Sequence, residues 1–165
     1  MVKYEITDEV HPQNRNRTLR RIRALRDIPR YGVKAGDLGG WIESEKNLTQ
    51  EGDCWVANNA SVYEDARVSE DALVSGEARV YGKAWVFGYA RISRKAWVSG
   101  NVRVSGNAWV SGKACVFGKA VIFGKAWVLG KAWVSDYAQV SGNAWVSEDA
   151  KVSGSTTVSG DERVS

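Results

Sequence analysis

The feature that most constrains this chain is a six-residue repeat that runs from Cys54 to Ser165 without an insertion or a deletion. Written from Ala60, the repeats begin ASVYED, ARVSED and ALVSGE and finish AKVSGS, TTVSGD and ERVS. A short fixed period means that one structural unit is repeated many times. Six residues cannot bury their own apolar surface, so the units must stack on one another to share a continuous core.

Each repeat carries a small and a large apolar residue two positions apart. The small slot is Ala in 15 of 18 repeats, and the large slot is Val everywhere except at Ile92 and Ile122. Alternate side chains of a strand point to the same face, so this pair predicts a short strand with both residues buried. Two residues after the large slot, Gly stands in 12 of 17 repeats, which predicts a corner with positive φ.

The series AWVSGN, ARVYGK and ACVFGK resembles the hexapeptide-repeat proteins. That resemblance implies an all-β fold, a single-stranded left-handed parallel β-helix in which three repeats make one triangular coil. Residues at the same position of every third repeat would then be neighbours, separated by ~4.8 Å along the axis. Residues 54–165 would make roughly six coils. The softer hexad LTQEGD at residues 48–53 would extend the helix backwards.

A closer resemblance lies in the first third of the chain. The runs KYEIT, LRRIRALRDI and VKAGDLGGWIESEKNLTQEGDCWV are similar to the opening of the YdcK-like hexapeptide proteins of enterobacteria and their prophages. Proteins of this group are described as acyltransferases mainly because of their fold. The association with prophages implies an accessory role in which the protein binds and inhibits a host component.

Residues 1–35 do not repeat and are expected to form a cap. Residues 4–7 are predicted to be a strand, whereas the apolar spacing of residues 18–28 fits a strand or a basic helix. A β-hairpin that covers the first coil is favoured, because the uncovered end of a β-helix exposes unpaired backbone groups. The predicted division is a cap over residues 1–35 and a β-helix over residues 36–165.

The cap is rich in arginine and carries one acid, Asp27, between residues 15 and 30. Two interpretations are open. The arginines pair with acids of the cap, or they form a surface for phosphate or an acidic partner, since the planar guanidinium suits both. The seven arginines are Arg15, Arg17, Arg20, Arg21, Arg23, Arg26 and Arg30, of which Arg20, Arg21 and Arg23 are the candidate anion-binding residues.

The residue between the two buried slots points outward, and seven of the eight tryptophans occupy that slot. Two interpretations are open for them as well. The indoles form an interface, most simply in a homodimer or a homotrimer, because Trp is enriched at interfaces. Alternatively, they stack on their neighbours and stiffen the coil. The candidate interface residues are Trp97, Trp109, Trp127, Trp133, Trp145, Phe117 and Phe123, and Trp109, Trp127 and Trp145 are predicted to form a ladder on one wall.

Three lysines, Lys95, Lys113 and Lys131, occupy the same corner position of every third repeat. They are predicted to share one edge of the β-helix, which we name the lysine edge. The edge is either a solvated ridge or a track for an anion or a nucleic acid.

The resemblance to hexapeptide-repeat acyltransferases implies a His general base and coenzyme A bound between subunits. This chain has one histidine, His11, which lies outside the repeat in a connection and is expected to be a surface residue. Cys54 and Cys115 have no histidine partner in the coils and are too far apart for a disulfide. Without a phosphate loop or a metal motif, we expect no cofactor, no metal site and no enzyme activity.

The net charge is +4, no apolar run reaches the length of a membrane span, and the N-terminus lacks a signal-peptide pattern. We therefore expect a soluble, cytoplasmic protein without a membrane partner. The favoured function is a non-enzymatic binding or scaffold protein that self-associates through Trp-bearing walls and captures another protein or an anionic partner. The alternatives are an acyl-CoA-dependent acyltransferase of the hexapeptide type and nucleic-acid binding through the lysine edge.

Overall fold

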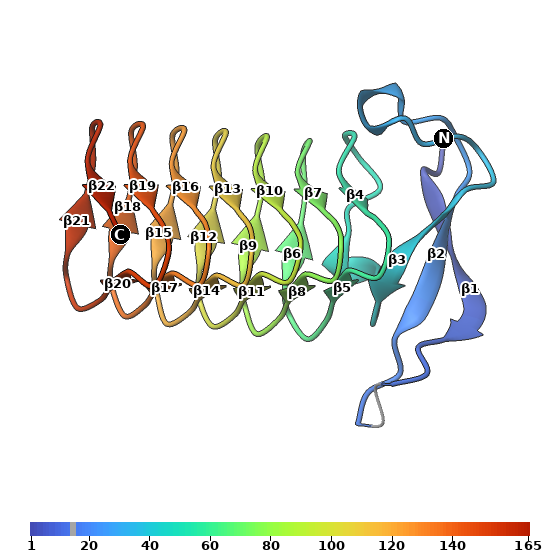
Figure 1. The fold of residues 1–165 in the computed structure, drawn as a ribbon. Helices are drawn as coiled ribbons and strands as arrows, with labels where there is room; N and C mark the ends of the chain where they lie inside the picture. The colour runs from blue at the N-terminus through green and yellow to red at the C-terminus, as the bar shows by residue number, and fades with distance from the viewer. Residues whose placement is uncertain (14–15) are drawn as a thin grey trace.

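The six-residue unit folds as a two-residue strand followed by a corner, and the strands stack into three flat walls (Figure 1). The structure is a computed structural model that describes residues 1–13 and 16–165. It is an all-β parallel β-solenoid of about seven coils, since the longest wall that contains only solenoid strands has seven of them. These seven strands run from Trp55 to Val164, so residues 54–165 hold six full coils and the start of a seventh, close to the roughly six coils expected from the sequence.

The three walls are named by the features that distinguish them: the N-terminal strands on one and the tryptophan ladder on another. The capped wall continues into the N-terminal strands and contains β5 (Ser61–Val62), β8 (Arg79–Val80), β11 (Trp97–Val98), β14 (Cys115–Val116), β17 (Trp133–Val134) and β20 (Lys151–Val152). The ladder wall contains β4 (Trp55–Val56), β7 (Leu73–Val74), β10 (Arg91–Ile92), β13 (Trp109–Val110), β16 (Trp127–Val128), β19 (Trp145–Val146) and β22 (Arg163–Val164). The third wall contains β6 (Arg67–Val68), β9 (Trp85–Val86), β12 (Arg103–Val104), β15 (Val121–Ile122), β18 (Gln139–Val140) and β21 (Thr157–Val158).

Neighbouring strands of a wall pair in parallel, and each strand pairs with the strand three repeats later. Trp109 lies opposite Trp127, which in turn lies opposite Trp145. The predicted columns are therefore confirmed, and residues of the same outward slot line one wall.

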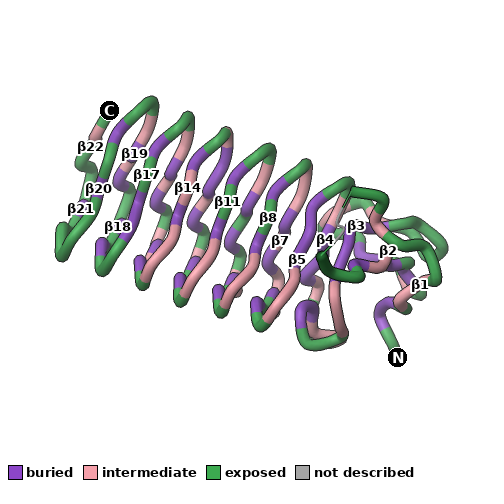
Figure 2. Tube along the Cα trace, turned by 90° about the horizontal axis from the view of Figure 1, so that it is seen from below, coloured by how far each residue is buried: buried purple, intermediate pink, exposed green. Residues whose placement is uncertain are grey.

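The core is the column of small and large slots that fills the bore of the solenoid. From Ala60 to Val146 every residue of these two slots is 0% exposed. The trace in Figure 2 accordingly alternates between buried and more exposed residues along each coil. Ala in one slot and Val in the other keep the bore narrow enough to be filled without voids, as close packing requires.

The corners adopt the positive φ that the glycines predict. All 12 glycines of the corner slot have positive φ, and so do the five residues that replace glycine there. At Gly112 an added Cβ would lie 2.6 Å from the carbonyl oxygen of Gly130, so the coil above leaves little room for a side chain.

Two of the acidic residues that replace glycine at the corners form hydrogen bonds that offset the strain of positive φ. The carboxylate of Glu64 accepts a hydrogen bond from the backbone N–H of Gly82 at 2.7 Å, and Glu70 accepts one from Gly88 at 2.9 Å. Each carboxylate thus satisfies an amide of the next coil, which offsets the strain of a side chain at positive φ.

The N-terminal residues form antiparallel strands across the first coil. β1 (Tyr4–Val10) pairs with β2 (Arg20–Ala24), β2 pairs with β3 (Leu38–Ile42), and β3 joins the capped wall in parallel with β5. Of the two alternatives for residues 18–28, the structure shows a strand at Arg20–Ala24. Two short 3-10 helices follow, at Pro29–Tyr31 and Glu45–Asn47. The division of the chain at residue 35 stays a prediction.

The solenoid extends backwards past Cys54, but with a change of register. Leu48 pairs with Val68, whereas Trp55 pairs with Leu73 in the regular spacing of the repeat. The coil that starts at Leu48 is therefore two positions longer than a regular coil, and the extra length lies in the corner between Leu48 and Cys54. We name residues 49–53 the wide corner.

The wide corner anchors the cap. The Gln50 side chain accepts hydrogen bonds from the backbone N–H groups of Lys3 and Tyr4 and donates one to the carbonyl of Tyr4. The Tyr4 hydroxyl donates to the carbonyl oxygen of Leu48 at 2.6 Å. These contacts fix the start of β1 against the first coil.

We predict that Glu70→Ala lowers the free energy of unfolding by about 1 kcal/mol, because alanine keeps the positive φ and loses the bond to Gly88. Glu70→Gly is the matched control and should change stability by less than about 0.5 kcal/mol, since relief of the strain offsets the lost bond. Urea unfolding followed by circular dichroism measures both variants. Equal losses in the two variants would contradict this account of the corner.

Candidate functional site

The capped wall presents the most exposed indoles of the solenoid. Trp97 and Trp133 are 44% and 48% exposed and flank Cys115 in the same column. The Arg79 guanidinium lies 5.3 Å from the centre of the Trp97 ring, and the Lys151 ammonium lies 5.8 Å from that of Trp133. The wall therefore has an aromatic centre and a basic group at each end.

Two further side chains complete this centre. Phe117 meets Trp133 edge-on, with ring centroids 5.7 Å apart. Burial raises the pKa of the half-buried Cys115 thiol, which stays protonated at neutral pH. Cys115 therefore adds apolar surface between the indoles rather than a charge.

The ladder wall uses its indoles differently. Trp127 stacks on Trp145 with centroids 4.7 Å apart and planes 13° apart, and it meets Trp109 edge-on at 5.3 Å. The Trp109 indole also donates a hydrogen bond to the Ser93 hydroxyl at 2.8 Å. All three indoles are half-buried, so much of their aromatic surface is covered by contacts within the chain.

The third wall carries two exposed aromatic rings, Trp85 and Phe123, each 39% exposed. Trp85 is held by a hydrogen bond from its indole to Ser69 at 2.9 Å and by contact with Phe87 at 4.4 Å. The sequence thus assigns the tryptophans of the outward slot to their walls, but the structure is needed to separate the exposed indoles from the stacked ones.

The structure places the lysine edge in one column, with an acid at each end. Lys95 lies 3.7 Å from Glu77, and Lys131 lies 3.9 Å from Asp149. Lys113 stands between the two other lysines, so repulsion between like charges on adjacent coils concentrates there. Binding of an anion or a nucleic acid at this edge stays a prediction.

The candidate arginines of β2 are paired with carboxylates of the neighbouring strand β1. Arg20, Arg21 and Arg23 form ion pairs of 3.6, 3.6 and 3.2 Å with Asp8, Glu9 and Glu5 respectively. An external anion at these residues would compete with the existing partners. Their anion binding stays a prediction, and Arg15 lies outside the described residues.

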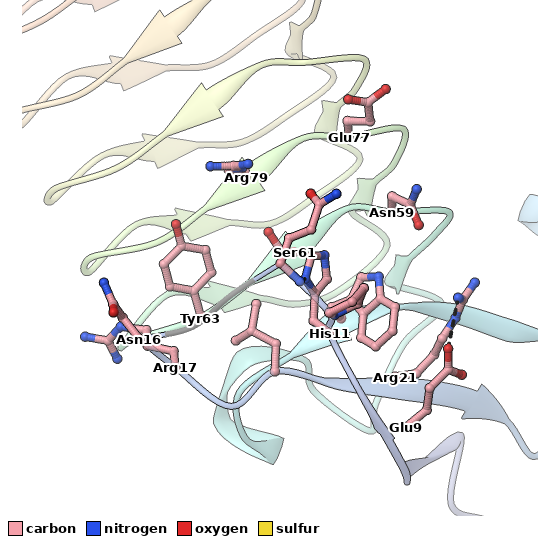
Figure 3. A pocket seen from close by; sticks show the side chains of 14 residues that line it. Glu9, His11, Asn16, Arg17, Arg21, Asn59, Ser61, Tyr63, Glu77 and Arg79 are labelled. Atoms are coloured by element: carbon pink, nitrogen blue, oxygen red, sulfur yellow. Dashed lines mark hydrogen bonds and ion pairs between the residues drawn. The ribbon is translucent and has the colours of Figure 1, made fainter.

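The structure also forms a groove of about 800 Å³ between the β1–β2 connection and the capped wall (Figure 3). His11 lies in it, edge-on to Trp41 with centroids 4.7 Å apart. Burial and, to a lesser extent, the nearby Arg79 lower the pKa of His11, whose Nδ1 accepts a hydrogen bond from the backbone of Gln13. His11 is therefore neutral at pH 7. Other lining residues include Ser61 and Tyr63.

The groove could not be predicted from the sequence, because His11 and Trp41 are far apart along the chain and belong to no shared motif. The available signal was the run Gly40-Trp41-Ile42, which has the small, outward and large pattern of a repeat. Trp41 is 3% exposed, and its indole N–H has no hydrogen-bond partner among the described residues. It is a donor that a bound molecule or water could satisfy.

Within residues 1–13 and 16–165, no group of three His, Cys, Asp or Glu side chains is arranged to hold a metal ion. In the same part of the chain, no helix is long and apolar enough to cross a membrane.

We predict that Trp127→Ala lowers the free energy of unfolding by about 2–3 kcal/mol, because the indole packs on both neighbours of the ladder. Trp133→Ala is the matched control on the capped wall, with an expected loss of about 1 kcal/mol or less since its ring is more exposed. Thermal and urea unfolding monitored by near-ultraviolet circular dichroism provides the comparison. A smaller loss for Trp127→Ala than for Trp133→Ala would refute the structural role of the ladder.

We also predict that Lys113→Glu raises stability by roughly 0.5–1 kcal/mol, because it replaces two repulsions by attractions to Lys95 and Lys131. Lys125→Glu is the control, since Asn107 and Asn143 flank it in its column and offer no charge. The gain should shrink in high salt, which screens exposed charges. An equal gain in stability in Lys125→Glu would show that relief of repulsion along the lysine edge does not cause the gain in Lys113→Glu.

Comparison with known proteins identifies the repeat. The family model described as the YdcK β-solenoid repeat matches residues 96–112 and 138–154. Each match spans one strand of every wall, β11 to β13 in the first and β18 to β20 in the second, so the family unit is one coil. A search of curated proteins found no match. The repeat and about seven coils of parallel β-solenoid agree, so this chain contains YdcK-type β-solenoid repeats and resembles the YdcK-like proteins.

Proposed function

We propose that this protein is a non-enzymatic scaffold that self-associates through its Trp-bearing walls and captures a second protein or an anionic partner. The observation that carries the proposal is the exposure of Trp97 and Trp133 on one flat wall. Rigid aromatic side chains that stand on a flat surface lose little conformational entropy on binding and supply much of the energy of interfaces.

The shape of the capped wall supports this function. From Arg79 to Lys151 the wall covers four coil steps, which at ~4.8 Å a step is roughly 19 Å along the axis. The indoles are held in place by the cation contacts at both ends and by Phe117. A partner therefore meets a surface that is already organised, which reduces the entropic cost of association.

The charges of the same wall favour one class of partner. Arg79 and Lys151 put positive charge on either side of the aromatic centre. A protein surface with an apolar middle and acidic flanks complements this pattern. The lysine edge adds positive charge at a corner of the coil and favours the same kind of partner.

We predict that the double variant Trp97→Ser/Trp133→Ser shifts the protein toward the monomer, because it removes the exposed indoles and leaves the buried column intact. Trp85→Ser on the third wall is the matched control and should leave the distribution of species unchanged. Light scattering coupled to size-exclusion chromatography over a range of concentrations measures the mass of each protein. A wild-type chain that remains monomeric at the highest soluble concentration would refute self-association.

A further inference from the structure

A lysine and a cysteine meet in the interior where the cap joins the solenoid. The ammonium nitrogen Nζ of Lys3 lies 3.0 Å from Sγ of Cys54, and both residues are 0% exposed. Lys3 immediately precedes β1, and Cys54 fills the first small slot of the uninterrupted repeat. The pair therefore links two segments that are 51 residues apart in sequence.

The wide corner creates this meeting. Its additional length turns the backbone so that the carbonyl oxygens of Glu51 and Gly52 lie 3.3 and 3.5 Å from Nζ. The Thr49 hydroxyl lies 3.3 Å from Sγ of Cys54 on the same side. The nitrogen of Lys3 thus has two carbonyls and one sulfur as its hydrogen-bond partners, and no carboxylate among them in the described part of the chain.

This environment favours the neutral form of the Lys3 amine. Burial is the main cause that lowers the pKa of Lys3, and the opposing attraction of Cys54 is smaller. Lowering that pKa raises the fraction of neutral amine, which is the form that attacks an electrophile. The nearest side-chain heavy atom to which the nitrogen donates is the sulfur of Cys54.

We propose that Lys3 and Cys54 are a covalent modification site, at which hydrogen peroxide converts the pair into a sulfenamide cross-link. In the first step the Cys54 sulfur attacks one oxygen of hydrogen peroxide, so the S–O bond forms and the O–O bond breaks. The sulfur loses two electrons and becomes a sulfenic acid, and the other oxygen leaves as water with the thiol proton. In the second step the Lys3 amine attacks that sulfur, the S–N bond forms, and the S–O bond breaks. The hydroxyl leaves as a second water with a proton from the amine.

The geometry favours the cross-link over further oxidation of the sulfur. The amine is already 3.0 Å from the sulfur, whereas each peroxide molecule must diffuse into a site that both residues bury completely. Entry of peroxide is therefore the slow step, and the sulfenic acid meets the amine before a second peroxide arrives. An intramolecular nucleophile in place competes strongly with one that must arrive from solution. The cross-link would tie residue 3 to residue 54 and hold the cap on the first coil.

The test uses the full chain with Cys115→Ser, so that Cys54 is the remaining thiol. After peroxide, we expect an intact mass lower by about 2 Da and one proteolytic product that joins the Lys3 and Cys54 peptides. Dithiothreitol should restore the original mass. We also expect the cross-linked protein to have a higher melting temperature than the reduced protein, because the bond closes a loop of the unfolded chain.

Two variants serve as controls. Lys3→Arg keeps a charge and hydrogen-bond donors but lacks the primary amine, so it should gain no cross-link. Cys54→Ala puts into this slot the residue that most repeats carry, so it should fold and show no change in mass. An unmodified Cys54 after peroxide, or its conversion to a sulfinic acid without a joined peptide, would overturn the proposal. Peptide mapping of the protein that retains Lys3 and Cys54 decides this even where a variant folds poorly.

Discussion

The structure depends on one constraint, the backbone hydrogen bonds between successive coils. The N–H of Trp97 donates to the carbonyl of Ala114, and that of Ser99 donates to the carbonyl of Val116, each at 2.9 Å. Within the regular repeat the pattern holds only while each coil keeps the same length, because a slip of one residue would turn the buried slots outward. In the sequence, this constraint appears as a repeat without insertions or deletions. The outward slot lies outside this constraint and is therefore free to carry Trp, Arg, Lys, Cys or Ser.

The parts of the fold that repeat could be predicted from the sequence, and the parts that occur once could not. Stacked valines, such as Val110 and Val128, and corners with positive φ, such as Gly112, occur many times along the chain. The repeated pattern therefore predicts them even where a single repeat deviates from it. The pairing of Lys3 with Cys54 and the groove around His11 have a single copy. Their contacts join residues far apart in sequence, and a periodic sequence pattern does not indicate such contacts.

The tryptophans show the same limit within the repeat itself. Trp55 and Trp97 occupy equivalent outward slots, yet Trp55 is 1% exposed and Trp97 is 44% exposed. The difference arises because β3 lies against Trp55, and a Cβ added at Gly39 would come within 2.7 Å of its ring. Slot identity therefore fixes the direction of a side chain, whereas the neighbouring coils and the cap fix its exposure. An interface cannot be assigned from the slot alone.

The wide corner, which interrupts the regular coil length, and the regular coils provide different kinds of site. Regular coils give flat surfaces of fixed spacing, which suit recognition of a partner over a broad area. A buried lysine beside a cysteine requires a backbone that departs from the regular coil, and the wide corner is the place where it does so. Its additional length frees the carbonyls of Glu51 and Gly52 and admits a buried lysine beside Cys54. Substitutions in the outward slots can therefore change the surface of the walls without disturbing the junction that holds the cap.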